Sequence, residues 1–129
     1  MSTYPRVVDP KLMPMEEFEP LVVDALDALP DWVHPVVAEI AVLVEDEQPA
    51  AEARPGVMLL GVFRGFPRTR YSGRPSGSLP DTITLYRIPI LLTSPTPEDV
   101  PGRVLKVLGH EVGHALGLSE GRLRELGWY

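Results

Sequence analysis

Two stretches of the chain, one near each end, carry apolar residues at the spacing of an amphipathic helix. In the first stretch, from Met15 to Leu29, the apolar positions are Phe18, Leu21, Val22, Ala25, Leu26 and Leu29. Because positions three and four apart share one face of a helix, this stretch is predicted to be helical. Pro20 fits only if the helix proper starts near Glu17, which would place the proline in its first turn.

The second helical pattern runs from about Pro97 or Gly102 to Leu116. Its apolar stripe consists of Leu105, Leu108, Val112 and Ala115 or Leu116. Gly117 is positioned to end this helix, because a glycine readily adopts the left-handed conformation needed just after a helix. Ser119 is then predicted to cap a last short helix that continues through Leu126.

Between these stretches, three runs rich in Val, Ile and Leu are predicted to be strands, at residues 38–45, 57–64 and 82–92. Pro89 indicates an edge position or a break in the last run. The order of elements predicts an α+β domain, with one small mixed sheet of three to four strands backed by two main helices. We expect residues 1–129 to form one domain, with residues 1–13 as an extended arm.

Composition and charge narrow the class of protein. Apolar residues make up 44% of the chain, so it can bury a core, and its net charge of −6 argues against nonspecific binding to nucleic acid. With no cysteine, the chain has neither disulfides nor a cysteine-built metal site. Residues 1–14 lack the pattern of a signal peptide, and no apolar run is long enough for a membrane span. We therefore expect a cytoplasmic protein.

The second helical stretch contains the motif HExxH, as His110, Glu111 and His114. Histidines four residues apart lie on one face of a helix, so both imidazoles can bind one metal ion at about 2.0–2.1 Å. The intervening glutamate is then placed to take a proton from a water activated by the metal. The motif predicts one zinc ion, with His110 and His114 as its ligands and Glu111 as general base.

The position of the motif supports this interpretation. Two of the chain's three histidines lie in it, and both fall off the apolar stripe of the helix. The alternative is that they are exposed histidines without a metal. Gly113 lies between them, where a glycine costs up to about 1 kcal/mol relative to alanine. Space near a metal or tight packing on a strand would offset that cost.

The motif continues as HEVGHALGLSEGRL, which resembles the extended zincin signature HExxHxxG, in which the glycine lets the chain turn back to the metal. The chain as a whole is similar to a family of minimal zincin-like metallopeptidases from bacteria. The similar stretches lie within residues 17–30, at VLVEDE (42–47), at DTITLYR (81–87) and from His110 to Trp128. The resemblance implies a compact α+β zincin core with His110 and His114 on the metal and Glu111 as catalytic base.

The third metal ligand has several candidates. The position that carries His or Asp in related signatures is Glu120 here, which could equally serve the dipole of the last helix behind its cap Ser119. Glu125 is an alternative ligand, although an ion pair with Arg122 or Arg124 on a solvated face is favoured. Ser119 itself and a water are the other candidates.

Three further features bear on function. Tyr71, Tyr86 and Tyr129 are candidates to assist at an oxyanion. The basic loop from Arg64 to Arg74 is either a solvated loop or a surface that recognises a carboxylate, a phosphate or a partner. An extended substrate could add to an exposed sheet edge, which the sequence places near residues 82–88.

The sequence thus supports three functions. The first is a zinc-dependent peptidase that cleaves a peptide or protein substrate. Because only 15 residues follow His114, the cleft is expected to be shallow, which favours a second hypothesis, a zincin-fold binding or regulatory module without turnover. The third is a hydrolase of non-peptide amides, since the motif does not name the bond that is cleaved.

Overall fold

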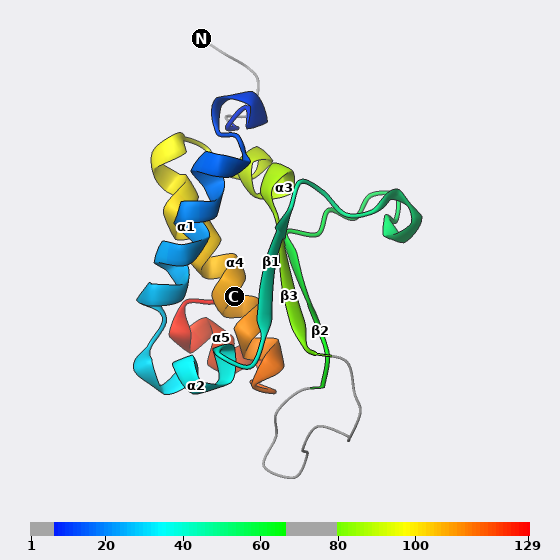
Figure 1. The fold of residues 1–129 in the computed structure, drawn as a ribbon. Coiled ribbons are helices and arrows are strands. Elements are labelled where there is room, and N and C mark those ends of the chain that lie inside the picture. The colour runs from blue at the N-terminus through cyan, green and yellow to red at the C-terminus, as the bar shows by residue number, and fades with distance from the viewer. Residues whose placement is uncertain (1–6, 67–79) are drawn as a thin grey trace.

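A three-stranded sheet lies against two long helices in the computed structural model, which describes residues 7–66 and 80–129 (Figure 1). The long helices are α1 (Met15–Ala28) and α4 (Val100–Ala115), and the strands are β1 (Ala41–Glu45), β2 (Gly61–Arg64) and β3 (Thr82–Tyr86). The shorter helices are α2 (His34–Val37), α3 (Arg87–Leu92) and α5 (Glu120–Leu126), and single 3-10 turns are η1 (Pro10–Leu12), η2 (Asp31–Val33), η3 (Ala50–Glu52) and η4 (Pro97–Asp99).

The sheet is mixed, in the order β1-β3-β2. β1 pairs with β3 in parallel, and β2 pairs with β3 in antiparallel orientation, with Gly61 opposite Leu85 and Phe63 opposite Ile83. This confirms the predicted α+β class with a small mixed sheet backed by two main helices. The expectation that the strand near residues 82–88 offers an open edge is wrong, because β3 is paired on both sides, and β1 and β2 are the outer strands of the sheet that the described residues form.

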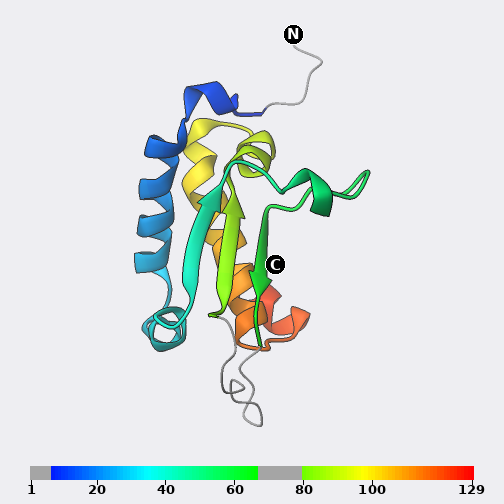
Figure 2. The ribbon, with the colours of Figure 1, turned by 45° about the vertical axis from the view of Figure 1, so that its right-hand side comes forward.

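The helices α1 and α4 cover one face of the sheet, as the two views of the ribbon show (Figure 2). α4 packs against α1 and lies across β2 and β3. Its buried side chains, which include Leu108 and Val112, meet Ile83 and Leu85 of β3 and Phe18 of α1 in one core, all with no exposed surface. The central position of α4 in this core fixes the helix that carries HExxH relative to the sheet.

The predicted strand over 82–92 is only half correct, because β3 ends at Tyr86 and residues 87–92 form α3. An apolar run does not by itself distinguish a buried strand from a buried helix. Pro89 is the third residue of α3, in the first helical turn, where a proline's missing N–H breaks no helical hydrogen bond. The proline therefore marks a change from strand to helix.

β2 is also shorter than the predicted strand over 57–64. Residues 57–60 precede it without strand pairing, and the side chains of Val57 and Met58 are 53% and 56% exposed. A turn at Gly56, whose φ is 76°, leads into this segment.

The helix α1 differs from its prediction at its start: it begins at Met15, and the exposed Pro20 lies in its interior and not in its first turn.

The N-terminal residues that the structure describes, 7–13, contact the core, where the sequence suggested an extended arm. Val8 is buried, and its N–H donates to the carbonyl of Leu91 at 3.1 Å. Arg87 holds the same segment: its Nη1 donates to the carbonyls of Pro10 and Met13 at 2.9 and 2.8 Å. Its Nε donates to Asp46 at 2.9 Å, so one side chain ties three segments together.

Within the described residues, every helix is too short or too polar to cross a lipid bilayer.

Replacing Arg87 by Met is expected to lower the free energy of unfolding by about 2–3 kcal/mol, because the change removes charge-assisted hydrogen bonds from a side chain that is only 11% exposed. Urea denaturation measures the change. Arg54→Met, at an exposed position in the 50–57 loop, serves as the matched control and is expected to stay within about 0.5 kcal/mol of the wild type. Equal effects of the two substitutions would contradict the role assigned to Arg87.

Candidate metal centre

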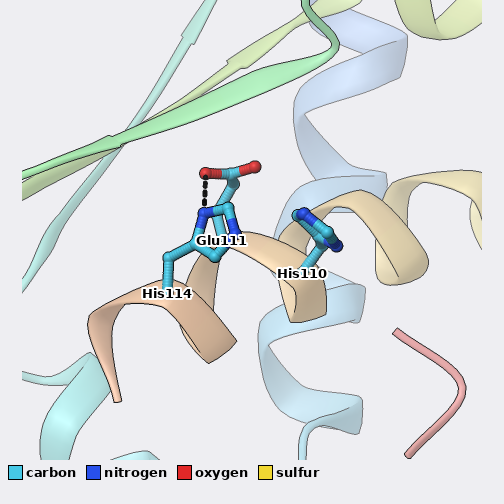
Figure 3. Close-up of side chains that lie close together, drawn as sticks. All are labelled: His110, Glu111 and His114. Atoms are coloured by element: carbon cyan, nitrogen blue, oxygen red, sulfur yellow. Dashed lines mark ion pairs between the residues drawn. The ribbon is translucent and has the colours of Figure 1, made fainter. Parts of the chain in front are cut away.

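His110, Glu111 and His114 project together from the last two turns of α4 (Figure 3). One potential ligand atom from each residue lies within 4.8 Å of the others. The imidazole rings of His110 and His114 meet edge to face, with 4.5 Å between their centroids. The spacing of four residues thus places both rings on one face of the helix, as the motif predicts.

A hydrogen bond from the C-terminal segment orients His110. Its Nδ1 lies 2.9 Å from the carbonyl oxygen of Trp128. Because a carbonyl oxygen can only accept, this contact requires the proton on Nδ1 and leaves the lone pair of Nε2 free. A ring nitrogen fixed in this way is the common arrangement of a metal-binding histidine, whose other nitrogen donates to an outer partner.

Two sharp turns bring Trp128 back over α4. After α4, the N–H of Leu118 donates to the carbonyl of Gly113, and Gly117 has a φ of 70°. After α5, the N–H of Trp128 donates to the carbonyl of Leu123, next to Gly127 with a φ of 79°. Both are Schellman motifs, in which a glycine in the left-handed region reverses the chain after a helix. The predicted helix end at Gly117 is therefore confirmed.

Two glycines on one face of α4 make room for this returning segment. A Cβ atom at Gly109 would lie 2.5 Å from the indole of Trp128, and one at Gly113 would collide with the side chain of Leu123. The glycine at 113 is thus explained by packing against α5, and not against a strand. Trp128 also stacks on Trp32, with 6.4 Å between the ring centroids.

Glu111 reaches in the other direction, to the edge of the sheet. Its carboxylate is only 9% exposed, and Oε1 accepts the backbone N–H of Phe63 in β2 at 2.9 Å. The same oxygen lies 3.4 Å from Nδ1 of His114. β2 approaches α4 closely because Gly61 has no side chain: a Cβ there would lie 3.1 Å from Val107. The glutamate is therefore held between the helix and an edge strand.

No further His, Asp or Glu in the described part of the chain joins these three residues in the cluster of potential metal ligands. Glu120 is the exposed first residue of α5 and lies outside this cluster. Ser119 caps α5, because its side chain accepts the N–H of Arg122 at 3.1 Å, as predicted. Glu125 pairs with Arg122 at 3.0 Å. His34 is far along the chain and lies 4.0 Å from Asp31.

Of the candidate tyrosines that the structure describes, Tyr129 contacts the cluster. Its ring meets that of His110 at a centroid distance of 5.8 Å, and the guanidinium of Arg124 covers it at 4.2 Å. Tyr86 is fully buried at the end of β3, where burial raises the pKa of its phenol, against the lowering effect of Arg64.

Tyr71 and most of the predicted basic loop lie outside the described residues. Arg64, at its start, pairs with Glu52 at 2.6 Å.

A pocket of about 310 Å³ opens beside His110 and Glu111. The described residues that line it come from the segment before β2, from one face of α4 and from the chain end: Met58, Leu59, Leu60, Gly61, Arg103, Lys106, Val107, His110, Glu111, Trp128 and Tyr129. A pocket of this size fits a small ligand or part of a peptide. The histidine and the glutamate are thus accessible from a defined cavity.

The sequence did not predict the roles of Phe63, whose N–H bonds to Glu111, and of Trp128, whose carbonyl bonds to His110. Their bonds to Glu111 and His110 use backbone groups, so these bonds leave no signal in the residue type. A usable signal was present only at Gly109, because a second glycine four residues before Gly113 marks a helix face that another segment approaches closely.

Comparison with known proteins identifies the family of the chain. The profile of the zincin-like metallopeptidase family matches residues 37–128, and the chain therefore belongs to this family. None of the curated proteins matches the chain significantly. The match begins before β1 and ends at Trp128, so it covers the sheet, the helix α4 and the segment that returns to His110.

We expect Gly109→Ala to lower the free energy of unfolding by about 1–3 kcal/mol, because the added methyl group displaces the indole of Trp128. The displacement should also weaken zinc binding by about tenfold, since Trp128 no longer fixes the ring of His110. Denaturant titration and competition with a zinc chelator measure the two effects.

Gly102→Ala on the same helix is the matched control. A Cβ atom at Gly102 meets nothing within 4 Å, so this substitution should keep zinc affinity and raise stability by up to about 1 kcal/mol. If both alanine variants bind zinc equally well, Trp128 does not position His110.

Proposed function

We propose that this protein is a zinc-dependent peptidase in which His110 and His114 bind the ion and Glu111 acts as general base. The observation that carries the proposal is the arrangement of Glu111, whose buried carboxylate is fixed by the N–H of Phe63 beside two accessible imidazoles. Membership of the zincin-like metallopeptidase family supports a hydrolytic role.

The residues present suit zinc in their chemistry. Imidazole nitrogens and a carboxylate are borderline and hard donors of the kind that zinc accepts, and His110 already has the outer partner that a ligand histidine needs. A bound zinc ion would supply a Lewis acid that polarises the substrate carbonyl and activates a water. Glu120 remains our proposed third ligand, and the alternatives are Ser119, Glu125 and a water.

Glu111 would carry the proton through the reaction. Its carboxylate takes a proton from the water whose oxygen attacks the carbonyl carbon, and it gives that proton to the amide nitrogen as the carbon–nitrogen bond breaks. The N–H of Phe63 keeps the carboxylate in position, and the low exposure of the side chain limits competing bulk water. The products are one carboxylic acid and one amine.

The outer edge of β2, where the N–H of Phe63 is bonded to Glu111, offers a place for an extended substrate at Gly61. The N–H of Tyr86 donates to the carbonyl of Leu60, so Leu60 turns its backbone groups toward β3. The groups of the next residue, Gly61, therefore face outward, where a peptide could add as a further strand beside the pocket. This placement favours a peptide over a small non-peptide amide.

Zinc content should depend on the two histidines. Protein purified without a metal-affinity tag is expected to hold about one zinc ion per chain by elemental analysis, and His110→Ala with His114→Ala should remove it. His34→Ala, outside the site, is the control. Among Glu120→Gln, Glu125→Gln and Ser119→Ala, the variant that weakens zinc binding by at least tenfold identifies the third ligand, and no effect in any of them indicates a water.

Glu111→Gln is expected to keep the zinc and to lower kcat/KM for peptide cleavage by a factor of about 10² to 10⁴, because the amide cannot accept the proton. A peptide-library screen by mass spectrometry supplies the substrates. Glu98→Gln, at an exposed position before α4, is the control. If the zinc-loaded wild type cleaves no peptide but binds one as tightly as Glu111→Gln does, the protein is a binding module without turnover.

A further inference from the structure

The pocket beside the metal centre is charged unevenly. Arg103 and Lys106 line it at the end of α4 that is remote from His114, and the only acidic residue among the described lining is Glu111. The remaining lining is mostly apolar or aromatic. The two cations give this part of the pocket a positive charge, whereas the chain as a whole has a net charge of −6.

The cations share one helix face with the metal centre. Arg103, Lys106 and His110 are spaced by three and four residues, which places them along a single line on α4. At a rise of about 1.5 Å per residue, Lys106 lies about 6 Å and Arg103 about 10 Å from His110 along the helix axis. An extended peptide advances about 3.3 Å per residue, so these distances correspond to two or three residues of substrate.

Both cations are available to a ligand. Lys106 is exposed and makes no ion pair with any residue in the described part of the chain. Arg103 is half-buried, and its Nε donates to the hydroxyl of Thr93 at 3.2 Å. That bond steadies the side chain and leaves the terminal nitrogens of the guanidinium free to bind a carboxylate, which suits their planar geometry.

We infer that Arg103 and Lys106 select peptides that carry a carboxylate two or three residues from the bond held at His110 and Glu111. This inference rests on the proposed function for the position of the scissile bond, but the binding of the carboxylate does not require turnover. The carboxylate comes either from an Asp or Glu side chain or from the free C-terminus of a short peptide.

The test measures binding by zinc-loaded Glu111→Gln, so that bound peptides stay intact. Fluorescein-labelled alanine-rich octapeptides carry one Glu at successive positions, with an amidated C-terminus, and each has a matched Gln peptide. A second set has no acidic side chain and a free or amidated C-terminus. Fluorescence anisotropy gives Kd, and the preferred set tells which carboxylate is recognised.

We expect the preferred acidic peptide to bind about tenfold more tightly than its neutral partner. Arg103→Gln and Lys106→Gln, added to Glu111→Gln, should each reduce that preference about threefold and together abolish it, as expected for partly exposed ion pairs. The preference should also fall as salt is raised. Arg54→Gln and Lys11→Gln remove an exposed arginine and an exposed lysine outside the pocket and should leave the preference unchanged. Circular dichroism checks the fold of each variant.

Three outcomes would overturn the inference. The first is equal affinity for acidic and neutral peptides. The second is a similar loss of preference in the Arg54 and Lys11 variants, which would indicate a general effect of charge. The third is a preference that survives the double substitution but disappears with a zinc chelator, which would assign the carboxylate to the metal. If the preference is found as expected but the wild type cleaves none of the bound peptides, the proposed peptidase activity fails and the selection of carboxylates stands.

Discussion

The contact of the C-terminal segment with α4 controls the geometry of the candidate metal centre. Gly109 and Gly113 remove the side chains that would keep Trp128 and Leu123 away from the helix, and only then can the carbonyl of Trp128 reach His110. A histidine on the surface of a helix would otherwise sample several rotamers. The close packing of two helices thus sets the orientation of one imidazole and the nitrogen that it presents.

Glu111 shows the same principle on the opposite side of the site. A carboxylate is costly to bury unless it is hydrogen-bonded, and here the N–H of an edge strand satisfies it. The short β2 is positioned for this role by Gly61, which lets the strand approach Val107. Three glycines that lie within a helix or strand, Gly61, Gly109 and Gly113, thus allow the close packing that positions Glu111 and His110.

Much of this arrangement could be predicted from local sequence, and part could not. The helix of HExxH, its end at Gly117 and the cap at Ser119 depend on neighbouring residues, whose spacing is visible in the chain. The change from β3 to α3 was missed because the apolar run 82–92 suits either element, and the buried contacts of Arg87 with Asp46 and the N-terminal segment come from distant parts of the chain. The hydrogen bond from Phe63 to Glu111 joins residues 48 positions apart and uses a backbone N–H, so no pattern of side chains predicts it.

The stacking of Trp128 on Trp32 has a spectroscopic consequence. These are the two tryptophans of the chain, so all of its indole absorption and emission originates from a pair that includes the residue bonded to His110. Coupling between stacked indoles depends steeply on their separation and relative angle. The near-ultraviolet circular dichroism of the unlabelled protein, to which its four tyrosines also contribute, should therefore change when Trp128 shifts against Trp32 and the segment bonded to His110 moves with it.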